Sequence, residues 1–194
     1  RAALVLLLGS MVQTAFAAVI NVSTQDNLND ALARAQAGDT LKLASGTYKT
    51  KLYIDKPITI EGPADRSAKI VGDRSGRTVA VHAPDVTLRN LTVSHSGMSL
   101  PAMDDGIYLE ETATRALVEH NNIIDNSVGV YIHGAAESMV RENKIIGDAN
   151  LRVNERGNGV TVWNAPGAQV VDNDISKGRD GIFSNTSTHN TYKG

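Results

Sequence analysis

One histidine and two methionines, His95, Met98 and Met103, lie close together in the sequence and have the side chains of a candidate metal site. The stretch that contains them is rich in Ser, Gly and Pro, which predicts a loop. An imidazole and two thioethers suit Cu(I) better than Zn²⁺ or Ca²⁺. We therefore hypothesise copper ligation here, with core filling as the alternative role of the methionines.

The remaining sequence gives little further support for a metal centre. His120 and His133 are predicted to be surface or turn positions, since His120 precedes a repeated asparagine and His133 ends an apolar run. The chain has no cysteine. This excludes a disulfide framework and any thiolate metal site.

Charged residues at predicted turns suggest a second kind of chemistry, the cleavage or epimerisation of acidic polysaccharides. A polyuronate lyase or epimerase needs a general base and groups that neutralise the substrate carboxylate. The candidates are Asp104, Asp105, Arg152, Arg156, Arg179 and Asp180. They form no recognisable catalytic arrangement, and acidic residues at turns usually are solvated or cap the turn. The enzyme is therefore the alternative hypothesis.

These residues lie among short apolar runs that repeat along the second half of the chain. Residues 118–123, 140–145 and 170–175 fit the pattern V-x-x-N-x-I. A second pattern, a glycine followed by apolar residues, occurs at 106–109, 129–132, 159–162 and 181–183. A period of about 22 residues is too short for propeller blades and lacks helical-repeat signatures. We predict an all-β, right-handed parallel β-helix, with the hand taken from the general preference of parallel crossovers.

Stacking of such coils gives the repeated asparagines a structural role. Equivalent positions in neighbouring coils lie about 4.8 Å apart, so Val and Ile form apolar stacks that face inward. Asn121, Asn143 and Asn173 are then predicted to form a ladder, because their amides can bond to one another and to the turn backbone.

The first half of the chain predicts shorter elements of the same kind. Apolar alternation predicts strands at 19–22, 40–43, 46–48, 52–54 and 58–62. Leu28, Ala31, Leu32 and Ala35 have helical spacing, with Thr24 as the candidate N-cap and residues 37–38 closing the helix. We expect this helix to cover the exposed strand edges of the first coil.

Two segments break the periodicity, and loops on a rigid scaffold often carry function. The coil between Gly129 and Gly159 contains a polar insertion at 147–157, and residues 95–103 form the other break. The candidate partner-binding residues are Arg152, Arg156, Trp163 and Arg179. Corner packing is the alternative role for Trp163, and pairing with Asp180 or Asp172 is the expected role of Arg179.

The ends of the chain suggest export and truncation. Residues 2–8 are apolar after Arg1, and residues 15–17 read Ala-Phe-Ala, which predicts a signal peptide at 1–17 and a β-helix domain at 18–194. A retained membrane span is disfavoured because polar residues interrupt the apolar run.

The formal net charge of −2 and the lack of a basic stripe disfavour nucleic-acid binding. Gly194 follows a strand signal with nothing to cover its edge, so we expect truncation there.

Three motifs in the last coils resemble the NosD family of periplasmic accessory proteins, which has a pectin-lyase-like β-helix. They are RGNGV at 156–160, WNAPG at 163–167 and GRDGIF at 178–183, and residues 96–109 fit the family less tightly. The resemblance implies a right-handed β-helix that docks on an ABC transporter in the periplasm. It also implies a role in assembling the copper-sulfur site of nitrous oxide reductase, including the handling of copper or sulfur.

The partners that the resemblance implies are the transporter and the reductase or its copper chaperone. It transfers no metal ligand to a particular residue of this chain. A non-enzymatic assembly factor is therefore the leading hypothesis. A polyuronate lyase or epimerase and a structural or adhesive β-helix are the alternatives.

Overall fold

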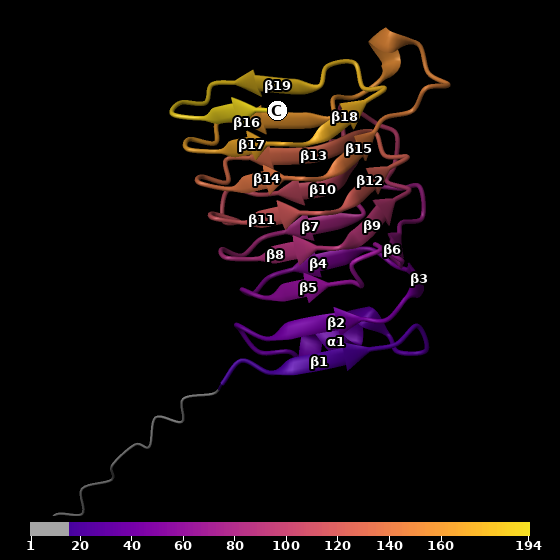
Figure 1. Ribbon diagram of the computed structural model, residues 1–194. Coiled ribbons are helices and arrows are strands. Elements are labelled where there is room, and N and C mark those ends of the chain that lie inside the picture. Colours follow the sequence, from indigo (N-terminus) through magenta and orange to yellow (C-terminus); the bar gives the residue numbers. More distant parts are fainter. Residues whose placement is uncertain (1–15) are drawn as a thin grey trace, which may run out of the picture.

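The computed structural model describes residues 16–194, which wind into a column of stacked coils (Figure 1). Each full coil contributes one strand to each of three parallel sheets, which we call A, B and C in the order in which the chain visits them. The two repeated sequence patterns give three strands per coil, because V-x-x-N-x-I spans a corner, with its Val in sheet A and its Ile in sheet B.

The three sheets are built from short strands. Sheet A contains β1 (Val19–Val22), β2 (Thr40–Leu43), β5 (Thr59–Glu61), β8 (Thr87–Arg89), β11 (Leu117–Glu119), β14 (Met139–Arg141), β17 (Gln169–Val171) and β20 (Thr191–Lys193). Sheet B contains β3 (Gly46–Lys49), β6 (Ala68–Val71), β9 (Leu91–Ser94), β12 (Asn122–Ile124), β15 (Lys144–Ile146) and β18 (Asp174–Ser176). Sheet C contains β4 (Leu52–Ile54), β7 (Val79–Val81), β10 (Asp105–Leu109), β13 (Val128–His133), β16 (Val160–Trp163) and β19 (Ile182–Asn185).

The core runs along the axis of the column as stacks of aliphatic side chains. In sheet A, Ile60, Leu88, Val118, Val140 and Val170 occupy one register position in successive coils and are almost completely buried. Small and branched side chains suit this narrow interior, because each must pack on an equivalent neighbour above and below.

The predicted asparagine ladder is confirmed at the corner between sheets A and B. Asn143 Oδ1 accepts hydrogen bonds from the backbone N–H and the side-chain amide of Asn121 at 2.9 and 3.0 Å. Asn173 Oδ1 accepts the equivalent pair from Asn143, both at 3.0 Å. The ladder ends at Leu91, whose backbone N–H donates to Asn121 Oδ1 at 2.9 Å. The amides thus satisfy backbone groups that would otherwise be buried without partners.

The residue before each ladder position turns the chain through a left-handed conformation. His120, Glu142 and Asp172 have φ values of 55°, 53° and 53°. Asn90, with φ of 57°, fills the same corner position, and Leu91 takes the place of a ladder asparagine. Residues 86–93 therefore carry their asparagine one position earlier than the later coils do.

The coils differ in length without losing their register. Asn121 and Asn143 are 22 residues apart, whereas Asn143 and Asn173 are 30 apart. Leu91 and Asn121 are also separated by 30 residues. The additional residues leave the coil between sheets B and C, and the later insertion contains a short 3₁₀ turn, η1 (Val153–Glu155).

The helix α1 (Leu28–Arg34) lies between β1 and β2 at the end of the column that the first coil forms (Figure 1). Its Leu28, Ala31 and Leu32 side chains are buried, in agreement with the predicted capping role. The N-cap is Asn27, which accepts hydrogen bonds from two backbone N–H groups of the first turn. The prediction of Thr24 was wrong, because Asn27 directly precedes the first helical residue and is itself a strong N-cap type.

Candidate functional site

The two segments that break the periodicity lie on either side of one hollow at the corner between sheets B and C. The first segment follows β9 and the second follows β15. The coil between them, which contains β12, turns from sheet B to sheet C without an insertion. The hollow has a volume of about 690 Å³. We call it the corner hollow, and its defining residues are Arg74, Met98, Ile124, Ile146, Asp148 and Lys177.

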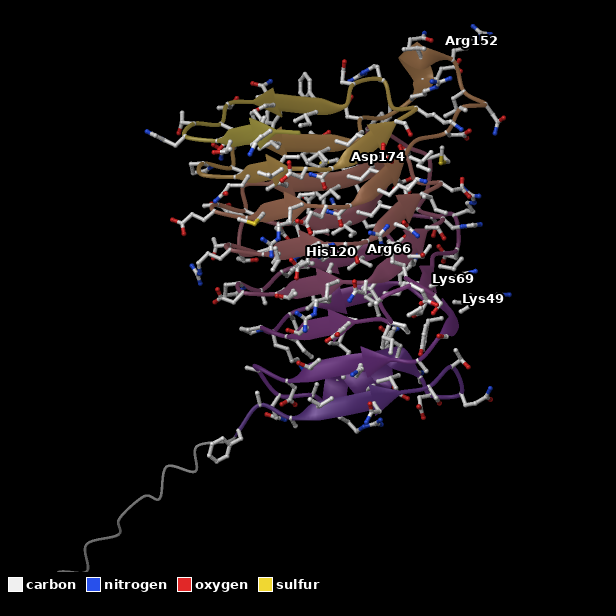
Figure 2. The ribbon with its side chains drawn as sticks, viewed as in Figure 1. Lys49, Arg66, Lys69, His120, Arg152 and Asp174 are labelled. Carbon is white, nitrogen blue, oxygen red and sulfur yellow. The ribbon has the colours of Figure 1, made fainter. Side chains whose placement is uncertain are left out.

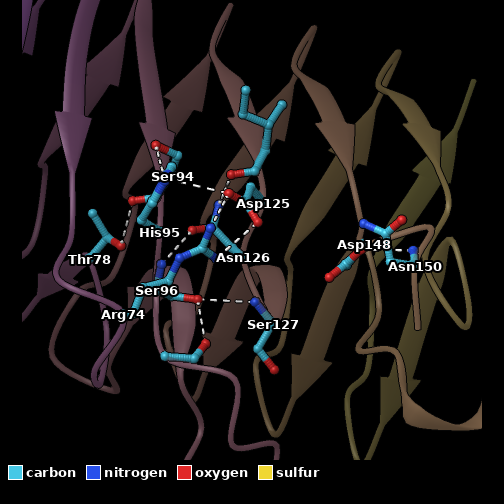
Figure 3. Close-up of polar contacts among 12 residues, drawn as sticks. Arg74, Thr78, Ser94, His95, Ser96, Asp125, Asn126, Ser127, Asp148 and Asn150 are labelled. Carbon is cyan, nitrogen blue, oxygen red and sulfur yellow. Dashed lines mark hydrogen bonds and ion pairs between the residues drawn. The ribbon is translucent and has the colours of Figure 1, made fainter. Parts of the chain in front are cut away.

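An ion pair between distant coils forms one wall of the corner hollow. Arg74 follows β6, and its guanidinium donates to both carboxylate oxygens of Asp125 at 2.9 and 2.5 Å (Figure 3). Arg74 has φ of 66°, a left-handed conformation that directs the chain out of the coil at this corner. Because both side chains are partly exposed, the pair contributes at most about 1 kcal/mol to stability and mainly fixes the position of the guanidinium.

Buried hydrogen bonds hold the corner behind this ion pair. The backbone N–H of Ser96 donates to Asn126 Oδ1 at 3.0 Å, and the backbone N–H of Ser127 donates to Ser96 Oγ at 3.0 Å. Asn126 Nδ2 also donates to the carbonyl of Val93 at 3.1 Å. These hydrogen bonds tie the segment after β9 to the corner after β12 (Figure 3).

The three copper candidates lie near this corner with different surroundings. His95 Nδ1 is 3.0 Å from Ser94 Oγ and 3.6 Å from the Asp125 carboxylate. Met98 lines the corner hollow and is 41% exposed. Met103 is tied through its carbonyl to Arg77 Nε at 3.2 Å. The donor set fits Cu(I) in chemical type, but these contacts do not join the three donors, and copper ligation stays a prediction.

The candidate partner-binding residues do not form one site. Arg156 donates to the carbonyls of Leu151 and Ala149 at 2.9 and 3.1 Å. Its side chain therefore stabilises the conformation of the insertion. Arg152 lies on the same insertion, away from the strands (Figure 2). Arg179 lies 3.3 Å from the Asp180 carboxylate, which agrees with the expected pairing.

Trp163 lies on a second surface, the outer face of sheet C. It is 39% exposed and lies in register with His133. One outward register position along sheet C is occupied in successive coils by Tyr53, Ala80, Tyr108, Tyr131, Thr161 and Phe183. The chain has one Trp, five Tyr and two Phe, and five of these eight residues lie on this face. The face was not predicted, although the sequence carries its signal, an aromatic residue two positions after Gly106, Gly129 and Gly181.

Tyr108 is the centre of the contacts on this face. Its hydroxyl lies 2.9 Å from Nδ1 of His133, and the Arg77 guanidinium carbon lies 3.4 Å from its ring centroid. Burial raises the pKa of the Tyr108 phenol, with Arg77 acting in the opposite direction. Tyr108 is therefore a neutral, buried phenol. His133 lies on the outer face, as predicted, where it is partly buried in this packed group.

The two adjacent aspartates before β10 have different environments. Asp104 accepts a hydrogen bond from the backbone N–H of Ser99 at 2.9 Å, which is the turn role expected for it. Asp105 is completely buried, and both of its carboxylate oxygens lack a hydrogen-bond partner among residues 16–194. Burial raises the pKa of Asp105 to about 8, Arg77 opposes the shift, and Asp104 adds to it. The prediction of a solvated or capping turn residue was wrong for Asp105.

The groups around Tyr108 on the outer face of sheet C are engaged with one another. Arg77, Tyr108 and His133 combine the types of group that a uronate lyase uses, but the Tyr108 side chain is only 3% exposed and is bonded to His133. A general base must reach the substrate proton. Within the described residues, no group of three or more His, Asp or Glu side chains is arranged to hold a metal ion.

None of the helices in the described part of the chain is both long and apolar enough to cross a membrane.

Comparison with known proteins identifies the family. The family model described as "Right handed beta helix region" matches residues 75–194. A Stutzerimonas stutzeri protein named "Probable ABC transporter binding protein NosD" is 31% identical over 140 residues, which cover 72% of this chain and 32% of the relative. A Pseudomonas aeruginosa protein of the same name is 27% identical over 148 residues, which cover 76% of this chain and 34% of the relative. The chain thus spans about a third of the length of these relatives.

Solved structures share the fold at low sequence identity. An alginate lyase from Paenibacillus sp. str. FPU-7 has a TM-score of 0.67 and 18% identity, over 88% of this chain and 65% of the lyase. Pectin methylesterase PemA from Erwinia chrysanthemi has a TM-score of 0.56 and 16% identity, over 82% and 56% of the two chains. These likenesses concern the fold alone. The family-model match and the two NosD relatives establish that the chain belongs to the right-handed β-helix family and is a NosD-like member of it.

Proposed function

We propose that this chain is part of a periplasmic accessory protein that docks on an ABC transporter and helps to assemble the copper-sulfur site of nitrous oxide reductase. The observation that carries the proposal is the similarity to two relatives named as probable ABC transporter binding proteins, which extends over 72% and 76% of the chain. The signal peptide predicted at 1–17 agrees with a periplasmic location, although residues 1–15 lie outside the described residues.

The geometry supports an assembly role in two ways. The column of stacked coils displays two exposed features, the corner hollow and the aromatic side chains of Tyr53, Trp163 and Phe183 on sheet C, and such surfaces suit binding partners that must be held in fixed positions. The phenol, imidazole and guanidinium groups that could do acid-base chemistry are already engaged with one another around Tyr108. A scaffold that binds partners therefore fits the side chains better than an enzyme does.

We expect deletion of the complete gene from its host to abolish or strongly reduce the conversion of nitrous oxide to nitrogen, with the reductase polypeptide still produced. Restoring the gene should restore the conversion. The tagged complete protein should also co-purify with an ABC transporter from detergent-solubilised membranes. Unchanged nitrous oxide reduction in the deletion strain would reject the proposal.

A polyuronate lyase or epimerase is the alternative, and the grouping of Arg77, Tyr108 and His133 is the observation in its favour. Incubation of the purified chain with alginate and with polygalacturonate distinguishes the two functions. The accessory role predicts no unsaturated sugar product and no change in uronate configuration. Either product, lost again in Tyr108→Phe, would favour the enzyme.

Copper ligation by His95, Met98 and Met103 is tested separately from the accessory role. Titration with Cu(I) against a chromogenic chelator is expected to show a site in the wild-type chain that disappears in the triple alanine variant. The matched control is Met139→Ala, since Met139 lies on sheet A away from the corner. Equal Cu(I) binding by the triple variant and the wild type would exclude these ligands.

A further inference from the structure

The turns that lead from sheet C to sheet A carry an excess of negative charge, and we call them the acidic edge. Their carboxylates are Asp55, Asp85, Glu110, Glu111 and Glu137, and their basic side chains are Lys56 and Arg115. Arg115 binds the Asp85 carboxylate at 2.7 and 2.8 Å. Lys56 Nζ donates to three carbonyls near the C-terminal end of α1, at 3.2, 3.3 and 3.2 Å. Both cations of the acidic edge are therefore already engaged.

Most carboxylates of the acidic edge lack a cationic partner among the described residues. Asp55, Glu111 and Glu137 are exposed, and within residues 16–194 none of them forms an ion pair. Glu110 contacts Nδ1 of His82, which is uncharged unless it is protonated. With the histidines neutral, the acidic edge therefore keeps a net negative charge that its own side chains do not balance.

The acidic edge adjoins the aromatic outer face of sheet C. The Tyr53 ring stacks on the His82 ring with 4.2 Å between the two centroids, and His82 in turn contacts Glu110. Tyr53 is 60% exposed, and Trp163 is the other large exposed ring close to this edge. The carboxylates and the rings thus form one continuous surface. Both kinds of group attract cations, the rings through the negative charge on their faces.

The stacking of the coils fixes the spacing of these groups along the column. Glu110 directly follows β10, Tyr53 lies on β4 two coils before it, and Trp163 lies on β16 two coils after it. At about 4.8 Å per coil, an exposed ring lies roughly 10 Å to either side of the central carboxylates. An extended segment of about six residues spans the whole distance, because a strand rises about 3.3 Å per residue.

We propose that the acidic edge and the adjoining rings of sheet C bind an extended, arginine-containing segment of a partner protein. Its guanidinium groups pair with Asp55, Glu110 and Glu111, and they stack on the rings of Tyr53 and Trp163. Charge complementarity selects a basic segment, because the free charges of the described residues at this edge are carboxylates. Arginine suits both contacts, since its planar guanidinium binds carboxylates through two hydrogen bonds and stacks on aromatic faces. The proposal rests on the chain having a protein partner, as the proposed function requires.

Fluorescence anisotropy with a labelled synthetic peptide of alternating Arg and Ala tests this site at about pH 7.5, where most histidines are neutral. The wild-type chain should bind the peptide, and added salt should weaken the binding. Asp55→Lys combined with Glu111→Lys should weaken it about tenfold or more, because two attractive charge pairs become repulsive. The matched control is Asp172→Lys combined with Asp174→Lys, which changes the net charge equally at exposed positions near sheet B. The control should weaken binding by no more than about twofold.

The contribution of the rings is measured in the same assay. Trp163→Ala should weaken binding of the Arg-Ala peptide about fivefold or more, as expected for an aromatic contact at the centre of an interface. Tyr192→Ala, which removes an exposed ring from sheet A, should keep the wild-type affinity.

Several outcomes would overturn the inference. One is equal affinity of the Asp55 and Glu111 double variant and its matched control, after circular dichroism has shown that both are folded. Another is equal binding of a Glu-Ala peptide. Calorimetric binding of Ca²⁺ without binding of the Arg-Ala peptide would assign the carboxylates to a metal cation instead. Because the peptide assay needs no transporter or reductase, its failure is distinguishable from failure of the proposed function.

Discussion

Replacement of Asn143 by alanine is expected to lower the free energy of unfolding by about 4 kcal/mol. Asn143 is 2% exposed and occupies the middle of the ladder. Its loss leaves two buried donors of Asn121, the backbone N–H and one N–H of the side-chain amide, without their shared acceptor. Each buried donor without a partner costs about 1–3 kcal/mol. Urea unfolding monitored by circular dichroism measures the difference.

Asn150→Ala is the matched control for this prediction. Asn150 is an exposed asparagine of the insertion at the corner hollow, so its truncation should change stability by less than about 0.5 kcal/mol. Equal unfolding midpoints for Asn143→Ala and the wild type would show that the ladder does not carry the stability that we assign to it.

The free energy of unfolding is expected to fall as the pH rises from about 4 to about 8 because of Asp105. Burial raises the pKa of Asp105 in the folded chain from 3.8 to about 8, whereas the unfolded chain titrates near 3.8. Between these values the folded state holds a proton that the unfolded state has released, so stability decreases with rising pH. At roughly 1.36 kcal/mol per pKa unit, the full loss is on the order of 5 kcal/mol.

Asp105→Asn should remove this pH dependence, since asparagine has no charge to bury. The variant is therefore expected to be more stable than the wild type near pH 8 and to differ least near pH 4. Asp174→Asn, at an exposed position, should retain the wild-type slope. Chemical unfolding at a series of pH values checks all three proteins. Parallel curves for Asp105→Asn and the wild type would contradict the neutral, buried carboxyl.

The fold could be predicted because its determinants repeat in the sequence. Asn121, Asn143 and Asn173 recur with the same flanking Val and Ile, and each repeat occupies an equivalent place in a stack. The length of each coil was harder to predict. Additional residues leave the column at a corner and do not disturb the strands, so the pattern survives an insertion.

The site was predictable only in part, because its contacts join distant coils. Residues from both breaks in periodicity line the corner hollow, and the concentration of function there stays a prediction. The sequence did not indicate that Arg74 reaches Asp125, or that Arg77 lies over Tyr108, since 51 and 31 residues separate these pairs. The burial of Asp105 was also missed, because neighbouring coils, and not neighbouring residues, enclose its carboxyl.

The copper content of purified nitrous oxide reductase tests the accessory role most directly. The enzyme is isolated from a strain that lacks the complete gene and from the same strain with the gene restored. We predict that the reductase from the deletion strain lacks copper at its copper-sulfur site and that the restored strain yields the fully loaded enzyme. Equal copper content in the two preparations would contradict the accessory role.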